Sequence, residues 1–197
     1  MMGYLIILVK TMHIETNSLK IDGCFSAKLT SFKDDRGTFQ KLFQSEVFKT
    51  FLPSFKPKEI YLTSSSKNVL RGMHFHLPPD DHEKIVICLS GRIQDVLLDL
   101  RKGKNFGKST YEILSPDGTN MMIIPKGIAH GFFSFEQNSN LLYLVGSEYN
   151  PKSDVGIHWN SFNFEWPTGK KIISNRDTNL QDLSKFKVPS QWKNKYV

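Results

Sequence analysis

Short apolar runs separated by turn residues recur through the middle of the chain. They lie at 111–114, 121–124 and 141–145, and each is bounded by Gly, Pro, Asp, Asn or Ser. A longer run, 85–100, carries a turn signal at Ser90-Gly91 that divides it into two strands. Strands at a spacing of about 8–12 residues, with turns between them, are typical of an antiparallel sandwich or barrel. The pattern therefore predicts an all-β protein.

Helical patterns are weak, so only a few short helices are expected. One is predicted over 44–51, stopped before Pro53, and a second over 179–186. Residues 168–197 are more polar and are expected to pack over the barrel, which leaves 1–197 as a single domain. The apolar run near the start is too short to span a bilayer and has no basic segment before it. We expect residues 1–11 to form an edge strand or an extension before a start at Met12.

The composition narrows the functional classes. The chain has 197 residues, 39% of them hydrophobic and 23% charged, as in globular proteins that bury their own core. Its net charge is +7, but the lysines form no basic block, so anionic small molecules are expected as ligands rather than nucleic acid or a membrane. Two cysteines among apolar neighbours, Cys24 and Cys88, favour a reduced, cytoplasmic location.

The segment Val69–Lys84, VLRGMHFHLPPDDHEK, concentrates ionisable side chains between two apolar runs. Buried charge is costly unless it is paired, and reactive sites collect groups with tunable pKa values. The segment is therefore the candidate site, although its residues Asp80, Asp81 and His82 are expected to lie in a solvated turn. A single histidine beside a strand is nevertheless more often a core residue, and Tyr143, taken by itself, also reads as core.

Several blocks in collinear order resemble the dTDP-4-dehydrorhamnose 3,5-epimerase family. The resemblance covers about residues 25–180 and rests on FKDDRGTF, VLRGMHF followed by Lys84, IPKGIAHGF, LLY with EYNP, GIHWN and SNRD. It implies a cupin-type antiparallel jelly roll, usually a homodimer. It also implies action on nucleotide-linked 4-keto-6-deoxy sugars without a metal or other cofactor.

The resemblance implies four catalytic residues. His74 matches the base that removes a proton next to the sugar ketone, and Asp177 matches the carboxylate that orients the imidazole. Lys84 matches the cation that stabilises the enolate, and Tyr143 matches the acid on the opposite face. A ketone needs such a base, acid and cation because charge develops on its oxygen when the proton leaves.

The resemblance also implies substrate-binding residues. Arg71 and Arg36 match ligands of the diphosphate, for which a guanidinium fork is suited. His130 and Tyr149 match residues of the sugar pocket, and Phe39 is expected in the pocket wall.

His76 departs from the family pattern, which has glutamine there. The change creates a second reading, a metal site of the metal-dependent cupin type built from His74, His76, Glu83 and His130. Such ligands would suit Fe, Mn or Ni. The spacing of His76 and Glu83 is too long for that pattern, so no metal is expected and His76 is predicted to contact substrate.

Lys41 and Glu59 are the second departure from the family pattern. An ungapped alignment places them where the family reads the thymine edge with a glutamate and a glutamine. A lysine only donates hydrogen bonds, and a lysine–glutamate pair would suit cytosine better. A CDP-linked sugar is therefore an alternative to the dTDP-linked one, unless the alignment slips here.

We expect an epimerase that inverts C5, C3 or both of a nucleoside-diphosphate 4-keto-6-deoxyhexose, in deoxysugar or O-antigen biosynthesis. Three rivals stay open: a related sugar ketoisomerase, a cupin that binds sugar nucleotides without catalysis, and a metal-dependent cupin.

Overall fold

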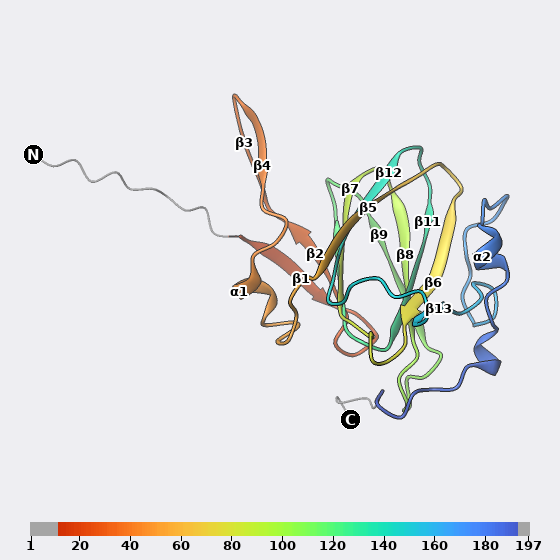
Figure 1. Ribbon diagram of the computed structural model, residues 1–197. Coiled ribbons are helices and arrows are strands. Elements are labelled where there is room, and N and C mark those ends of the chain that lie inside the picture. Colours follow the sequence, from red (N-terminus) through yellow and green to blue (C-terminus); the bar gives the residue numbers. More distant parts are fainter. Residues whose placement is uncertain (1–11, 193–197) are drawn as a thin grey trace, which may run out of the picture.

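Two antiparallel sheets pack face to face in the computed structural model, which describes residues 12–192 (Figure 1). The six-stranded sheet has the order β1 (Ile14–Ser18), β2 (Phe25–Leu29), β10 (Met121–Ile124), β7 (Lys84–Ser90), β12 (Ser139–Val145) and β5 (Glu59–Ser65). The five-stranded sheet has the order β13 (Asp154–Gly156), β6 (Leu70–His76), β11 (Ile128–Ser134), β8 (Ile93–Asp99) and β9 (Ser109–Leu114). The expected all-β jelly roll is confirmed, and so are the strands expected at 85–100, 111–114, 121–124 and 141–145.

A separate hairpin and three short helical turns complete the described structure. The hairpin, β3 (Ser31–Asp34) and β4 (Gly37–Gln40), projects away from the sandwich (Figure 1). The helical turns are α1 (Ser45–Phe48), α2 (Asn175–Thr178) and a 3₁₀ turn (Leu183–Lys185). Between residues 12 and 192, none of the helices is both long and apolar enough to cross a membrane. The prediction for residues 1–11 lies outside the described residues.

The helix expected over 179–186 is only partly formed, as the 3₁₀ turn Leu183–Lys185. Regular helix instead begins one turn earlier, at Asn175, where the Oγ of Ser174 accepts a hydrogen bond from the backbone N–H of Asp177 at 3.1 Å. A serine at this position caps a helix start because it satisfies an otherwise unpaired N–H. Leu183 in the 3₁₀ turn and the following Phe186 pack against the five-stranded sheet.

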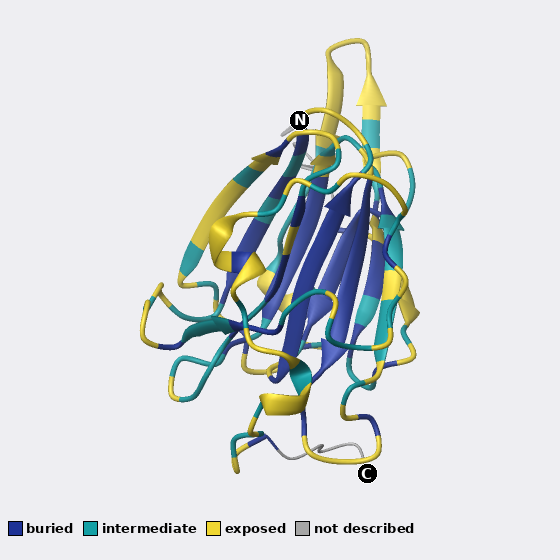
Figure 2. Cartoon of the chain, turned by 90° about the vertical axis from the view of Figure 1, so that its right-hand side faces the viewer, coloured by how far each residue is buried: buried dark blue, intermediate teal, exposed yellow. Residues whose placement is uncertain are grey.

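Three apolar layers explain why the central strands are buried on both faces (Figure 2). The middle layer lies between the sheets, with residues such as Val86, Leu97 and Phe132. The segment around α1 covers the outer face of the six-stranded sheet through Phe48 and its neighbours. The C-terminal segment, ending at Trp192, covers the outer face of the five-stranded sheet. The middle layer is thereby shielded from solvent on both sides.

An irregularity in β6 decides which of its side chains face the interior. Between the pairs His130–His74 and Phe132–Arg71 the register shifts, because β6 has one residue more than β11. Such a bulge changes the phase of the alternation along a strand. Leu70, Met73 and Phe75 all join the outer layer, so Arg71 and His74 share the opposite face although they are three residues apart.

The bulge depends on a close approach of two glycines. Gly72 has φ +111°, and a Cβ there would lie 2.6 Å from the Cα of Gly131 on β11. The positive φ already favours glycine, and the neighbouring backbone leaves no room for a side chain.

Gly72→Ala is therefore expected to destabilise the protein more than Gly37→Ala. Gly37 has a similar φ of +123°, but nothing lies within 4 Å of its ideal Cβ. Gly37→Ala should cost about 1–3 kcal/mol of unfolding free energy for the strained backbone. Gly72→Ala should cost about 1–3 kcal/mol more for the steric conflict. Urea unfolding of both variants measures the difference, and equal losses would contradict the close approach.

Candidate active site

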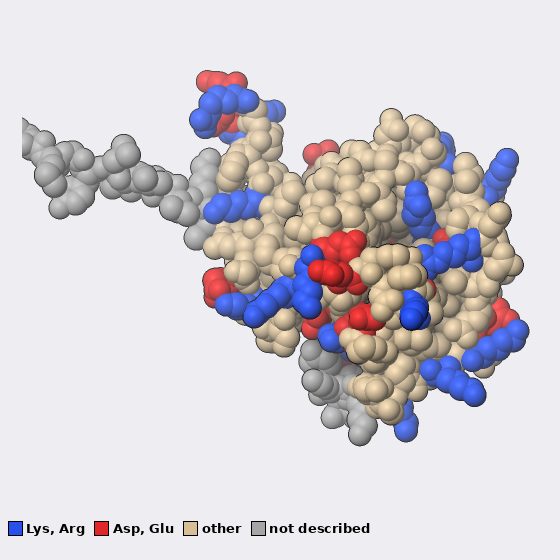
Figure 3. Space-filling view, in the orientation of Figure 1, with Lys and Arg blue, Asp and Glu red and all other residues tan. Residues whose placement is uncertain are grey.

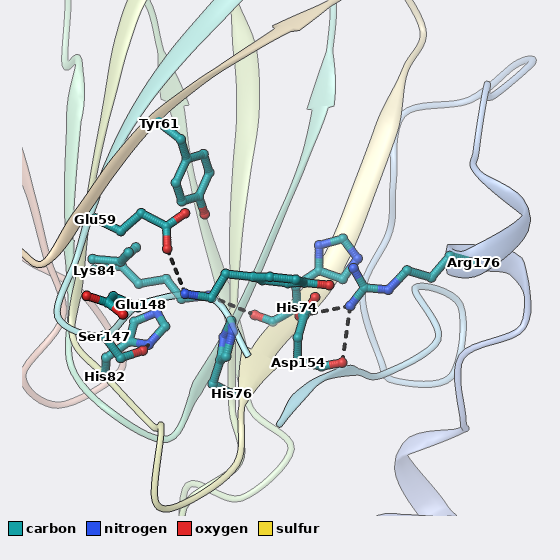
Figure 4. A pocket seen from close by; sticks show the side chains of 12 residues that line it. Glu59, Tyr61, His74, His76, His82, Lys84, Ser147, Glu148, Asp154 and Arg176 are labelled. Carbon is teal, nitrogen blue, oxygen red and sulfur yellow. Dashed lines mark hydrogen bonds and ion pairs between the residues drawn. The ribbon is translucent and has the colours of Figure 1, made fainter. Parts of the chain in front are cut away.

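A pocket of about 300 Å³ opens at the end of the sandwich where β5, β6 and β7 meet the 145–149 segment (Figure 4). His74, His76, His82 and Lys84 line it together with side chains of β5 and of the segments 145–149, 154 and 176. Two predicted catalytic residues, His74 and Lys84, therefore lie in one cavity.

His74 is held by a carboxylate from a distant part of the chain. Its Nε2 lies 2.7 Å from Oδ1 of Asp177, on α2. The other carboxylate oxygen accepts a hydrogen bond from the backbone N–H of Gly72 at 3.1 Å. With Nε2–H donating to Asp177, the His74 Nδ1 carries a free lone pair. This is the arrangement of an oriented general base.

Asp177 remains ionised although it is buried. Burial by itself raises the pKa of the carboxyl, but the hydrogen bond from His74, the charge of His74 and the Gly72 N–H outweigh it, so the pKa lies below its usual value. An ionised carboxylate fixes the orientation and the tautomer of the imidazole that it holds.

Lys84 is a buried cation in the pocket lining. Only 6% of its surface is exposed, and its Nζ donates to the backbone carbonyl of His74 at 3.3 Å. Burial lowers the pKa of Lys84 to about 8, although the charge of Asp154 opposes the shift. A poorly solvated ammonium interacts strongly with charge that develops beside it.

Two tyrosines from neighbouring strands stack at the side of the pocket. Tyr61 on β5 and Tyr143 on β12 are cross-strand partners, with ring centroids 4.7 Å apart and an interplanar angle of 10°. Tyr61 lines the pocket, whereas Tyr143 is 6% exposed and is not among the lining residues. Burial raises the pKa of both phenols, so both keep their protons at neutral pH.

His130 lies deeper in the sandwich than the pocket lining. Its Nε2 is 2.8 Å from Oδ2 of the fully buried Asp95, and its ring makes an edge contact with Tyr143 at 5.8 Å. Burial raises the pKa of Asp95, and the charge and hydrogen bond of His130 oppose that shift. His130 thus supports Tyr143 rather than lining the pocket.

Arg71 shares the inward face of β6 but points toward β5. Its Nε donates to the Oγ of Ser65 at 3.1 Å, and its Nη2 donates to the carbonyl of Ser64 at 3.3 Å. The residue as a whole is exposed. The guanidinium is thus held near the pocket but outside its lining.

The three predicted binding residues near the hairpin do not reach this pocket. Arg36 is 88% exposed in its side chain and pairs with Asp34 at 2.6 Å, and Phe39 packs against Phe32. Neither of them, nor Lys41, is among the residues that line the pocket. Figure 3 shows cations on this projecting hairpin and others scattered over the same face.

Glu59 and Tyr149 meet at the pocket mouth. Oε2 of Glu59 accepts a hydrogen bond from the backbone N–H of Tyr149 at 2.7 Å, and both residues line the pocket. The Tyr149 ring is 62% exposed, and it makes an edge contact with His76. An exposed aromatic at a pocket mouth can stack on a flat ligand group.

His82 was expected in a solvated turn with Asp80 and Asp81, and this expectation is wrong. His82 is 7% exposed, and its Nδ1 lies 2.6 Å from the Oγ of Ser147. Asp80 is tied down by the side chains of Asn150 and Ser153. The signal was available in the sequence, because His82 is two residues before Lys84 and therefore shares its face if the strand is extended.

The alternative metal site is not assembled. Among residues 12–192, no group of three His, Cys, Asp or Glu side chains is placed to hold a metal ion. His74 and His130 instead pair with separate carboxylates, Asp177 and Asp95.

Other pocket residues were not singled out in the sequence. Asp154 and Arg176 form an ion pair of 2.8 Å in the pocket wall, and Tyr61 provides a second phenol. Arg176 precedes Asp177 within SNRD, so this motif could have indicated that Arg176 is also a pocket residue. Tyr61 and Asp154 carry no such signal, because only strand pairing brings them to the pocket.

Comparison with known proteins points to one family. The family model for dTDP-4-dehydrorhamnose 3,5-epimerase matches residues 18–185. The enzyme of that name from Escherichia coli K12 is 37% identical over 161 residues, which are 79% of this chain and 86% of the relative.

Solved structures of similar proteins show the same fold. A Legionella pneumophila dTDP-6-deoxy-D-glucose-3,5-epimerase in complex with dTDP-4-keto-L-rhamnose superposes with a TM-score of 0.83 at 28% identity, covering 89% of this chain and 95% of that one. The dTDP-4-dehydrorhamnose 3,5-epimerase of Sulfolobus tokodaii gives 0.82 at 32% identity, covering 89% and 98%. The resemblance seen in the sequence motifs is confirmed: the chain belongs to the dTDP-4-dehydrorhamnose 3,5-epimerase family.

Proposed function

We propose that this protein epimerises a dTDP-linked 4-keto-6-deoxyhexose at C5, C3 or both, in deoxysugar biosynthesis. The observation that carries the proposal is the His74–Asp177 pair, held at 2.7 Å and facing the same cavity as the buried cation of Lys84. A base and a cation in one pocket are what removal of a proton next to a ketone requires.

In the proposed reaction, the Nδ1 of His74 takes the proton from the carbon beside the ketone. The electron pair of that C–H bond moves into the ring and places negative charge on O4. The ammonium of Lys84 stabilises this charge, and Asp177 stabilises the imidazolium. Return of a proton from the other face inverts the carbon.

We propose Tyr143 as the donor of that returning proton. Its phenol is protonated at neutral pH, and it is fixed between the stacked Tyr61 and the His130 ring. Tyr61 lines the pocket and Tyr143 does not, so the proposal requires Tyr61 to move aside when the substrate binds.

The nucleotide is proposed to bind at the pocket mouth. Tyr149 and Glu59, which line the pocket, would meet the base, and Arg71, which lies outside the lining, would meet the diphosphate. The basis for a CDP-linked substrate is weaker, because Lys41 is not in the pocket beside Glu59.

We further propose a homodimer, because the outer face of the six-stranded sheet is incompletely covered. Ile60 and Leu62 on the edge strand β5 are 60% and 57% exposed, and Leu62 pairs with Leu142 on β12. Adjacent exposed apolar side chains on an edge strand are typical of an interface. A second copy could also bring the β3–β4 hairpin, with Arg36 and Phe39, to its partner's pocket.

The two buried free cysteines agree with a proposed cytoplasmic location.

The first prediction from this proposed function concerns the catalytic base. In deuterated water, the wild-type protein should incorporate deuterium at C5, C3 or both of a dTDP-4-keto-6-deoxyhexose. His74→Ala and Asp177→Asn should lower the exchange rate by about 100-fold or more, because the oriented base is lost. Mass spectrometry and NMR of the product measure the exchange.

His158→Ala is the matched control, since this histidine lies outside the pocket lining and should leave exchange unchanged. Absence of exchange in the wild-type protein would overturn the epimerase proposal. A shifted keto group would identify a ketoisomerase, and faster turnover of the CDP-linked sugar would identify the other nucleotide.

The second prediction is an alkaline limit on kcat. Lys84, with its pKa lowered to about 8, is charged below that pH and neutral above it. Loss of the ammonium removes the stabilisation of O4, so kcat should fall about tenfold per pH unit above pH 8. The residual activity of Lys84→Met should not show this fall. A wild-type rate that stays constant to pH 9.5 would contradict the role of Lys84.

The third prediction tests the dimer by complementation. Arg36→Ala and His74→Ala should each be inactive or nearly so. If the hairpin of one copy completes its partner's pocket, random mixing should restore about a quarter of the wild-type activity, because half of the dimers are mixed and each has one intact site. If subunits exchange between the dimers and no activity is recovered, Arg36 does not contribute to the partner's site. Ile60→Lys with Leu62→Lys should yield a monomer in size-exclusion chromatography.

A further inference from the structure

A second pair of imidazoles lies in the same pocket, and the proposed proton transfers do not use it. The rings of His76 and His82 have centroids 4.6 Å apart and are tilted by 45°. Figure 4 shows them beside one another below Lys84. His76 follows His74 by two residues on β6, and His82 precedes Lys84 by two residues, so the pair adjoins the proposed base and cation.

Both imidazoles are neutral. Burial, followed by the charge of Lys84, lowers the pKa of each, and His82 reaches about 3. A neutral imidazole has one N–H donor and one nitrogen acceptor. The hydrogen-bonding capacity of the pair is therefore determined by which nitrogens carry protons.

The surroundings of His82 identify its tautomer. Its Nδ1 lies 3.0 Å from the backbone carbonyl of Asp80, and a carbonyl can only accept. Nδ1 also lies 2.6 Å from the Oγ of Ser147, whose hydroxyl donates to the same carbonyl at 3.0 Å and so accepts from Nδ1. Nδ1 therefore carries the proton, and Nε2 is an acceptor. That Nε2 is buried and has no hydrogen-bond partner among residues 12–192.

His76 has no partner on either ring nitrogen. Within the described residues both Nδ1 and Nε2 are buried and unpaired, which leaves one donor and one acceptor. Buried polar atoms without partners are rare in folded proteins because each one is costly. Three such atoms on two adjacent rings in a ligand pocket indicate that a ligand supplies the partners.

We propose that His76 and His82 form a subsite that binds a hydroxyl group on the hexose ring of the substrate, and this rests on the proposed function. A hydroxyl can donate to Nε2 of His82 while it accepts from the N–H of His76. A methyl group does neither, a phosphate oxygen only accepts, and an ammonium only donates.

The subsite would orient the sugar. A 4-keto-6-deoxyhexose linked through C1 has its ring hydroxyls at C2 and C3 and its methyl group on the other side of the ketone, at C5. When O4 lies at Lys84 and a ring hydroxyl lies at the imidazole pair, the methyl group at C5 points away from that pair. The pair would thereby determine which carbon faces His74 and would select sugars that keep this hydroxyl.

The test compares binding of dTDP-6-deoxyglucose with its 2-deoxy and 3-deoxy analogues by calorimetry. The wild-type protein should bind one analogue about 10- to 100-fold more weakly, because the buried nitrogens then lose their partner. The variant His76→Leu with His82→Leu should bind all three alike. His76→Gln should stay near wild type, because an amide keeps a donor and an acceptor. His158→Leu serves as the control for a histidine outside the pocket.

The outcomes separate this proposal from the proposed function. If the wild-type protein binds all three sugars equally, or if the double variant still discriminates, the hydroxyl subsite is overturned even where epimerisation occurs. If the wild-type protein discriminates but exchanges no deuterium, the epimerase proposal fails and the subsite stands. Circular dichroism of the double variant shows whether it is folded. If it is misfolded, the binding comparison is made with the single variants His76→Leu and His82→Leu instead.

Discussion

The close contact between Gly72 and Gly131 is the constraint on which the site depends. Their backbones approach so closely that a Cβ at either position would lie within 2.7 Å of the other strand. This contact permits the bulge in β6, which turns Arg71 and His74 to the same face. It also leaves the N–H of Gly72 free to hold Asp177, so the same few backbone atoms direct the proposed base and its carboxylate.

Burial governs the electrostatics of the pocket. It lowers the pKa of Lys84, His76 and His82 and raises that of the two stacked tyrosines. The result is a site with one cation of reduced solvation, neutral imidazoles and protonated phenols. In the proposed reaction, a cation in such surroundings would act on the ketone oxygen with little competition from water. The C-terminal segment that covers the outer face of the five-stranded sheet also supplies Asp177, from α2, to the proposed base.

Much of the fold could be predicted, because strands with regular turns have a clear pattern. The strands expected at 85–100, 111–114, 121–124 and 141–145 were located to within two residues, whereas β11 was not predicted. The helix expected over 179–186 forms only a 3₁₀ turn, because apolar residues such as Phe186 can pack against a sheet without being helical. His82 was misassigned because three neighbouring polar residues suggested solvent, whereas its position relative to Lys84 places it inside.

The sequence by itself determined the all-β class, the family and the residues that could carry the chemistry, because strand alternation and collinear motifs are local properties. Only the tertiary structure decided which of these residues meet. His74 and Asp177 are 103 positions apart and come within hydrogen-bond distance only because α2 packs beside β6. Likewise, the stacking of Tyr61 on Tyr143 and the outward direction of the β3–β4 hairpin follow from strand pairing, which sequence spacing does not encode.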